Sequence, residues 1–265
     1  MRRPSYKVNK GSLYHKKSMD GVRGKKLSLS FAFEQFKNNW RDWRWYYFQF
    51  TNHIVSKYYA LKHNNGIYVW KEDWDNLILL DACRYDLFKE ITGLEVEHRI
   101  SRGSDTLEFL IENFGGRRYS DTVVVTANPQ VDKRVRDSFY RVIPVWKYGW
   151  DDTYKTVLPQ TMLRYAIEAN ERFPDKRLLI WFLQPHAPFI GSPELSYAGS
   201  VTVWEAVFKG YIGVNQVWDA YKRNLEIVIP YAFELARKLP GKTVITSDHG
   251  QAFRRLGFPL PIKIL

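Results

Sequence analysis

Cysteine is almost absent from this chain of 265 residues, which contains Cys83 alone. A single cysteine excludes a disulfide within the chain and any cysteine-rich zinc site. The sequence also lacks a run of about 18 uncharged apolar residues, the length that a membrane-spanning helix needs. Residues 1–30 have no apolar signal-peptide core and are rich in Lys, Arg and Ser instead. We therefore expect a cytoplasmic protein, with peripheral attachment to a membrane as the open alternative.

The positive charge is concentrated at the N-terminus. Residues 1–29 contain nine Lys or Arg residues and one acid, Asp20, which contribute +8 of the total net charge of +12. Such an arm can attract nucleic acid, acidic lipid or a phosphorylated substrate, or it can be a solvated tail without a partner. The charge alone does not choose among these anions.

An aromatic block over residues 30–63 predicts a helix. Its apolar residues recur at steps of three and four, which places them on one helical face: Phe33, Phe36, Trp40, Trp43, Tyr47, Phe50 and Ile54. The preferred interpretation is burial against the same domain or a partner chain. The second interpretation is a helix that lies on an anionic membrane surface. The third is a stacking platform for nucleic acid, a partner that we do not favour. Residues 1–65 are thus predicted to be an N-terminal helical appendage.

From about residue 66 the pattern alternates between strands and helices. Strands are expected over 77–80, 122–126, 178–183 and 243–246, with a helix over 106–114 and helices near 84–91, 159–172 and 214–238. This order predicts an α/β domain over residues 66–265, with a mostly parallel sheet between helical layers.

Two of these strands deliver acidic side chains at their ends. Leu77–Leu80 is an uninterrupted apolar run followed by Asp81, and the strand over 243–246 leads to Asp248 and His249. Open α/β sheets bind ligands at the carboxyl ends of their strands. Two carboxylates with an imidazole suit a divalent metal ion, so we expect the two strands to be neighbours and the two carboxylates to lie close together. The alternative is that Asp81 caps a helix and His249 forms hydrogen bonds within a loop.

Four motifs carry a resemblance to a known family. LLDACRYD at 79–86, SRGSDT at 101–106, LQPHAPF at 183–189 and TSDHGQAF at 246–253 resemble the alkaline phosphatase/sulfatase superfamily, most closely its sulfatase-like branch. The resemblance implies an alkaline phosphatase-like fold. It also implies that Asp81, Asp248 and His249 bind a divalent metal ion, which could be zinc, manganese, magnesium or calcium.

The resemblance further implies a nucleophile at a helix N-terminus. Ser101, Ser104 and Thr106 are candidates, and Thr106 is favoured because it opens the apolar pattern of the predicted helix. Its alternative role is that of an N-cap, which Ser104 or Asp105 could equally supply. In relatives a histidine placed like His186 contacts the transferred group or the leaving group, although His186 could also be a structural loop residue.

The chain departs from this family in two respects. The sulfatase motif Cys-x-Pro-x-Arg is absent, and Cys83 lies too close to Asp81 to take its place. Relatives often carry another histidine beyond the Asp-His-Gly element, but residues 250–265 contain none. Either that ligand is absent or the sequence is truncated at Leu265.

These observations predict a metal-dependent hydrolase or transferase acting on phosphate or sulfate esters through a Thr nucleophile. Phosphate ranks above sulfate because the cysteine motif is missing. Arg84 and Arg102 are weaker candidates for binding the anionic substrate. The competing interpretation is a non-catalytic binding protein that keeps the fold with an incomplete metal site.

Overall fold

The computed structural model describes residues 64–196, 203–208 and 210–251, together with Phe36, Lys37, Trp40, Arg41 and Tyr46. The chain divides into two units, Met1–Gln49 and Phe50–Leu265, and the fold given below is that of the second. Most of the helix predicted over residues 33–54 lies outside the described residues, although Phe36, Lys37 and Tyr46 are helical. The basic arm of residues 1–29 also lies outside them, and the domain boundary at residue 65 stays a prediction.

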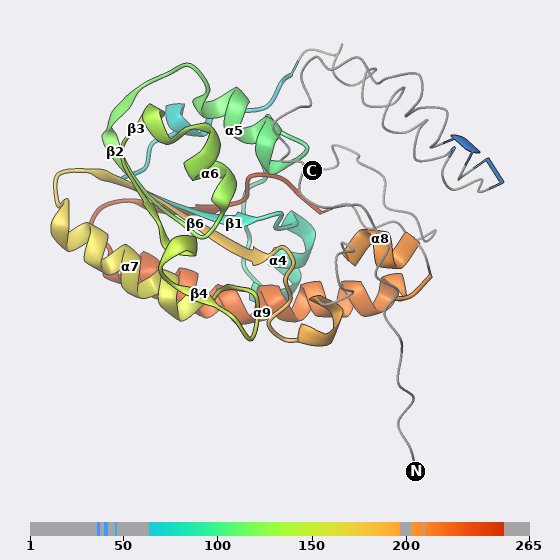
Figure 1. Ribbon diagram of the computed structural model, residues 1–265. Coiled ribbons are helices and arrows are strands. Elements are labelled where there is room, and N and C mark those ends of the chain that lie inside the picture. Colours follow the sequence, from blue (N-terminus) through green and yellow to red (C-terminus); the bar gives the residue numbers. More distant parts are fainter. Residues whose placement is uncertain are drawn as a thin grey trace. The chain divides into compact units, whose positions relative to one another are not determined.

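A five-stranded sheet forms the centre of the second unit (Figure 1). Its spatial order is β3 (Phe139–Pro144), β2 (Tyr119–Thr126), β6 (Arg177–Pro185), β1 (Asn76–Asp81) and β7 (Thr243–Thr246). Every neighbouring pair is parallel. Parallel neighbours need crossover connections, and helices lie in most of these connections. The predicted mostly parallel sheet is confirmed, and so is the prediction that the strands leading to Asp81 and Asp248 are neighbours.

Helices cover both faces of the sheet (Figure 1). One layer consists of α4 (Tyr85–Thr92), α7 (Pro159–Arg172) and α9 (Val214–Lys238), and the other of α5 (Thr106–Phe114) and α6 (Pro129–Arg134). Successive side chains of a strand point to opposite faces. In β1, Ile78 and Leu80 therefore join the core under the first layer, whereas Leu77 and Leu79 join the core under the second. Burial on both faces explains why this strand is apolar without interruption.

Three helices and one strand have the predicted bounds, and the other predicted elements differ by one to three residues at an end. The helices over 106–114, 159–172 and 214–238 and the strand over 243–246 occur as predicted. The other three predicted strands are longer by one to three residues at one or both ends, and the helix predicted near 84–91 occupies 85–92.

The sequence pattern did not predict β3, α6, α8 (Val203–Phe208) or the antiparallel pair of β4 (Trp150–Asp151) and β5 (Thr156–Val157). Three of these elements have six residues and two have only two, so they present too few positions for a periodicity to be read. Short 3-10 turns complete the described fold: η2 (Val69–Lys71), η3 (Arg136–Ser138), η4 (Val145–Lys147) and η5 (Pro193–Ser196). Among the helices described, none combines the length and the apolar character that crossing a membrane would require.

Candidate metal centre

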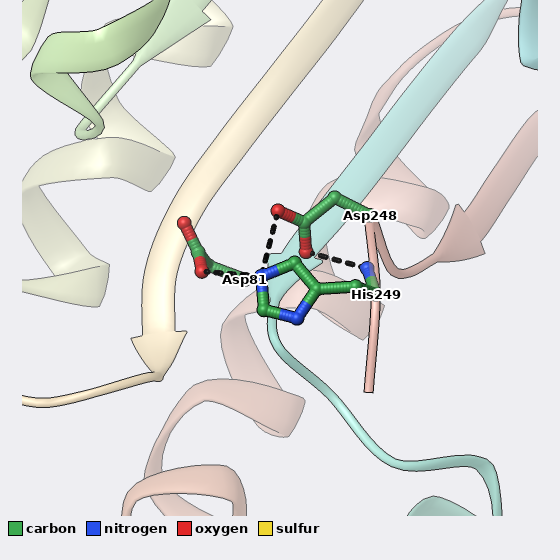
Figure 2. Close-up of side chains that lie close together, drawn as sticks. All are labelled: Asp81, Asp248 and His249. Carbon is green, nitrogen blue, oxygen red and sulfur yellow. Dashed lines mark hydrogen bonds and ion pairs between the residues drawn. The ribbon is translucent and has the colours of Figure 1, made fainter. Parts of the chain in front are cut away.

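The ends of β1 and β7 bring three predicted ligands together. Asp81 is the last residue of β1, and Asp248 and His249 follow shortly after β7. Because the two strands are parallel neighbours, their carboxyl ends lie at the same edge of the sheet. One ligand atom from each of the three residues lies within 4.8 Å of the other two. Figure 2 shows the imidazole of His249 facing both carboxylates. The predicted closeness of the carboxylates is confirmed.

Asp248 is fully buried and held by backbone donors. Its Oδ1 accepts the N–H of Ala82 and the N–H of His249, each at 2.9 Å. Ala82 has a φ of 60°, a left-handed conformation that residues with a Cβ rarely adopt. In this conformation, directly after β1, the N–H of Ala82 points toward Asp248 Oδ1. The other oxygen, Oδ2, therefore remains available to Thr106 and His249.

Asp81 is buried as well, and its surroundings favour the neutral acid. The pKa of Asp81 is raised to about 6, first by burial and then by the charge of Asp248, while His186, His249 and Asn128 oppose the increase. Its Oδ2 accepts a hydrogen bond from Asn128 Nδ2 at 2.6 Å. Within the described part of the chain, no Lys or Arg forms an ion pair with Asp81 or Asp248.

Asn128 is the site residue that the sequence analysis missed. It lies two residues beyond β2 and caps α6, because its Oδ1 accepts the N–H of Gln130 at 2.9 Å. A signal was present: an asparagine before Pro129, just past the strand expected over 122–126, is typical of a helix N-cap at the carboxyl edge of the sheet. The same side chain thus starts a helix and orients Asp81.

His249 presents one ring nitrogen to the carboxylates. Its Nε2 lies 3.5 Å from Asp248 Oδ2 and 3.9 Å from Asp81 Oδ1, while Nδ1 lies 3.1 Å from the carbonyl oxygen of Gly250. Burial alone would lower the pKa of His249, but Asp248 and Asp81 outweigh it, so the pKa is raised. In the neutral ring, donation from Nδ1 to Gly250 leaves the lone pair on Nε2, which is the usual state of a metal-binding histidine.

These residues fit a divalent cation. Two buried carboxylates beside each other repel, and a protonated imidazole offsets only part of their charge. A cation with carboxylate and imidazole ligands would remove this imbalance. The alternative roles do not account for the geometry: Asp81 caps no described helix, and the Nε2 of His249 faces acids rather than loop carbonyls.

Thr106 is the hydroxyl residue that reaches this cluster. Its Oγ1 donates to Asp248 Oδ2 at 2.9 Å and lies 3.5 Å from Asp81 Oδ1 and 3.4 Å from His249 Nε2. Thr106 is the first residue of α5, and the N-cap is Asp105, whose side chain accepts the N–H of Glu108. The hydroxyl of Thr106 is therefore not needed for capping.

The two alternative hydroxyls have other partners. Ser104 Oγ donates to Glu108 Oε2 at 2.7 Å. Ser101 Oγ donates to the backbone carbonyl of Asp248 rather than to its carboxylate. Of the three hydroxyl candidates, Thr106 is the one placed against the side chains of the cluster.

His186 lies beside the cluster without belonging to it. It follows β6, the other neighbour of β1, and its N–H donates to the carbonyl oxygen of Asp81 at 3.2 Å. Its Nδ1 lies 2.6 Å from the carbonyl oxygen of Ala187. The structure thus brings His186 to the same edge of the sheet as the three candidate ligands.

The two candidate arginines are engaged by the protein itself. Arg84 forms an ion pair with Asp86, and Arg102 donates to the carbonyl oxygen of Gly66 at 2.7 Å and lies over the ring of Tyr68. Neither guanidinium contacts the three candidate ligands, although Arg84 lines a cavity that also reaches His249.

A cavity of about 340 Å³ lies next to the cluster. His249 and Ser247 line one part of it, and much of the remainder is apolar, including Leu80, Phe109 and Ile245. Cys83 also lines this cavity, but burial raises the pKa of its thiol above the usual range, which keeps the sulfur protonated. A volume of this size is within the range of small-molecule sites.

Comparison with known proteins gives two distant structural matches. No protein-family model and no curated protein matches the chain. The integral membrane protein lipooligosaccharide phosphoethanolamine transferase A from Neisseria meningitidis is 14% identical with a TM-score of 0.46, and the alignment covers 88% of this chain and 56% of that one. The soluble domain of the same transferase is 12% identical with a TM-score of 0.45, covering 70% and 69%.

Both structural matches are members of the alkaline phosphatase/sulfatase superfamily, which the sequence motifs resemble. This chain spans little more than half of the full-length transferase.

Proposed function

We propose that this protein is a metal-dependent enzyme that cleaves or transfers phosphate esters through Thr106. The observation that carries the proposal is the contact of Thr106 Oγ1 with Asp248 Oδ2 at 2.9 Å, with Asp81 and His249 on the same side of the hydroxyl. A hydroxyl placed against three candidate metal ligands is positioned for activation, because a bound cation would favour its ionised form.

Asp81, Asp248 and His249 would hold the divalent ion. Zinc and manganese suit this mixture of oxygen and nitrogen ligands, whereas magnesium and calcium favour oxygen alone. When bound, the ion supplies positive charge that favours the ionised hydroxyl and offsets the charge of the phosphoryl oxygens.

Thr106 acts as the nucleophile in this proposal. Its Oγ1 bonds to phosphorus, the bond from phosphorus to the leaving-group oxygen breaks, and the hydroxyl proton passes to water, because Asp248 is needed in its ionised form as a ligand. The position of Thr106 at the first turn of α5 adds the positive end of the helix dipole, which favours a bound phosphoryl group. Attack by water would then complete hydrolysis, and attack by another hydroxyl would complete transfer.

His186 is assigned to the leaving group. Its loop begins where β6 ends, next to Asp81, and its imidazole can donate a proton to the departing oxygen when protonated. The apolar cavity beside His249 would take the organic part of the ester. Phosphate is preferred to sulfate because the sulfatase cysteine motif is absent and the one cysteine, Cys83, is held as a neutral thiol.

Turnover of simple esters tests the proposal. Protein stripped of metal with a chelator is given manganese, zinc, magnesium or calcium, and nitrophenol release is followed from p-nitrophenyl phosphate and bis(p-nitrophenyl) phosphate, with nitrocatechol sulfate for comparison. We expect release from a phosphate ester that depends on the added metal. Metal binding by calorimetry without turnover of any ester would overturn the enzymatic proposal and indicate the non-catalytic binding protein instead.

A further inference from the structure

One buried side chain of α9, Asn224, holds the loop that carries His186. Its Nδ2 lies 3.2 Å from the carbonyl oxygen of Pro185, 3.1 Å from that of His186 and 3.2 Å from that of Pro188. Its Oδ1 accepts the N–H of Ile190 at 2.9 Å. A single amide group therefore contacts the loop at four backbone positions.

The polar character of Asn224 is exceptional on this face of α9. Asn224 is fully buried, and the surrounding buried positions of the helix are mostly apolar, as in Leu225 and Val228. The side-chain amide has two N–H donors and one carbonyl oxygen, and both of its ends are used on this loop. The loop also needs a donor from outside, because Pro185 and Pro188 have no N–H to contribute.

The loop held by Asn224 is attached directly to the candidate centre. The N–H of His186 donates to the carbonyl oxygen of Asp81 at 3.2 Å, and Nδ1 of the ring lies 2.6 Å from the carbonyl oxygen of Ala187. The charge of His186 is also among the influences that lower the pKa of Asp81. A shift of this loop would therefore move the imidazole relative to Asp81.

We propose that Asn224 is a positioning residue that fixes His186 relative to Asp81 and Thr106. Asn224 touches no reacting group in this proposal and acts through the loop alone. The competing interpretation is that Asn224 satisfies buried carbonyls and contributes only to folding. The inference that Asn224 controls catalysis depends on the proposed function, whereas its control of the loop does not.

Amide hydrogen exchange, followed residue by residue by NMR, tests the control of the loop. In Asn224→Leu the amide of Ile190 loses its acceptor outright, so the informative amide is that of His186, whose acceptor is Asp81. We expect its exchange rate to rise about tenfold or more relative to amides in β2. Leu225→Ala is the matched control, because it removes a buried side chain from the same helix without removing a hydrogen bond to the loop.

Unchanged exchange at His186 in Asn224→Leu would overturn the proposal, and so would an equal rise in Leu225→Ala at a similar loss of thermal stability. If Asn224→Leu does not fold, Asn224→Asp is measured in the same way. That variant keeps the size and the acceptor oxygen and removes the N–H donors.

A double-mutant cycle tests the catalytic part with diphenyl phosphate and manganese, because the departing phenolate is basic enough to need a proton. We expect Asn224→Leu to lower kcat/KM by about tenfold or more, as supporting residues around metal centres do. In a His186→Ala background the same substitution should have little further effect, because its target is already absent. Additive losses would show a general structural effect and overturn the proposal. A wild-type protein without turnover would refute the proposed function, while hydrogen exchange would still decide whether Asn224 holds the loop.

Discussion

Thr106 Oγ1 lies 2.9 Å from Asp248 Oδ2, although 142 residues separate them in the chain. The contact forms only when the start of α5 and the end of β7 are both docked against β1. The N–H groups of Ala82 and His249 orient the carboxylate of Asp248, and the hydroxyl of Thr106 donates to its other oxygen. Such preorganisation is what an electrostatic site needs before substrate binds.

Asp248→Asn should abolish metal binding without destabilising the metal-free protein. The amide oxygen can still accept from Ala82 and His249, and the repulsion between Asp248 and Asp81 disappears. We expect a metal-free melting temperature equal to or above that of the wild type. The increase on adding manganese or zinc should be lost, together with ester turnover. Differential scanning fluorimetry with and without metal measures both effects.

Asp132→Asn is the matched control for this substitution. Asp132 is also a buried carboxylate, but it forms ion pairs with Arg136 and Lys147. Both cations are partly exposed, with 51% of the Arg136 side chain and 35% of the Lys147 side chain accessible, so losing the charge of Asp132 should cost up to about 1 kcal/mol. Its melting temperature should fall with and without metal, while the increase caused by metal remains. A metal-induced increase that survives in Asp248→Asn would contradict the assignment of Asp248 as a ligand.

Thr106→Val should remove activity while keeping the fold. Valine has the shape of threonine without the hydroxyl, and Asp105 continues to cap α5. Loss of a nucleophile lowers kcat/KM by at least about a thousandfold. Ser104→Ala should cost far less, because Ser104 contacts Glu108 rather than the cluster. Equal losses in the two variants would refute the role of Thr106, and a phosphate adduct on Thr106 in intact-protein mass spectrometry would support it directly.

The centre was predictable in the sequence wherever an element has a strong periodic pattern. Asp81 and Asp248 each follow an apolar strand, and the parallel register of β1 and β7 then places their carboxylates together. Thr106 was the favoured nucleophile because the apolar pattern of its helix starts there. The choice between Thr106 and Ser104 needed coordinates, since both precede the same apolar face and only side-chain direction separates them.

Asn128 and Asn224 show what such patterns leave out. Asn128 orients Asp81 through a single hydrogen bond, and its place in the sequence indicates only a helix cap. Asn224 contacts backbone carbonyls more than 30 residues away, so no local spacing reveals it. Contacts of this kind depend on tertiary docking, which a sequence pattern does not encode.

The free energy of unfolding of the metal-free protein should fall as the pH rises through the pKa of Asp81. The pKa of Asp81 in the folded state is about 6, above the value of 3.8 for an ordinary aspartic acid. Between these values the folded state binds more protons than the unfolded state, so the contribution is complete below pH 4 or so and is lost by about pH 6. The difference is on the order of 3 kcal/mol. The raised pKa of His249 acts in the same direction as the pH rises further.

The stabilisation caused by added metal should instead increase as the pH rises, because the ligands must lose their protons to bind the ion. We expect manganese or zinc to raise the melting temperature more at about pH 7.5 than at about pH 5. Asp248→Asn is the control for the metal-free protein, since it removes the charge that helps to raise the pKa of Asp81 and should weaken the fall in stability with pH. A metal-induced increase of the same size at both pH values would contradict the assignment.

Two substitutions of Asn128 separate its two roles. Serine and aspartate both serve as N-caps, so Asn128→Ser and Asn128→Asp should each keep α6. Neither can donate an amide N–H to Asp81 Oδ2, and we expect metal affinity to fall about tenfold in Asn128→Ser. Asn128→Asp adds a third carboxylate beside Asp81, so its metal-free form should lose more stability between about pH 5 and pH 7 than Asn128→Ser. Calorimetric titration and thermal melts at the two pH values measure these effects. Identical pH dependence in both variants would mean that Asn128 does not influence Asp81.

Acidic membrane lipid is one of the anions that the basic arm can attract. Residues 1–29 carry a net charge of +8, and each basic residue near an acidic leaflet contributes about 1 kcal/mol. We therefore propose that residues 1–65 tether the enzyme to a surface where lipid-linked phosphate esters would lie. The full-length protein should float with vesicles containing phosphatidylserine at low salt, and less at high salt because screening shortens the attraction. Residues 66–265 alone, checked for folding by circular dichroism, and neutral phosphatidylcholine vesicles are the controls. If the full-length protein stays in the bottom fraction with anionic vesicles at low salt, the tether does not exist.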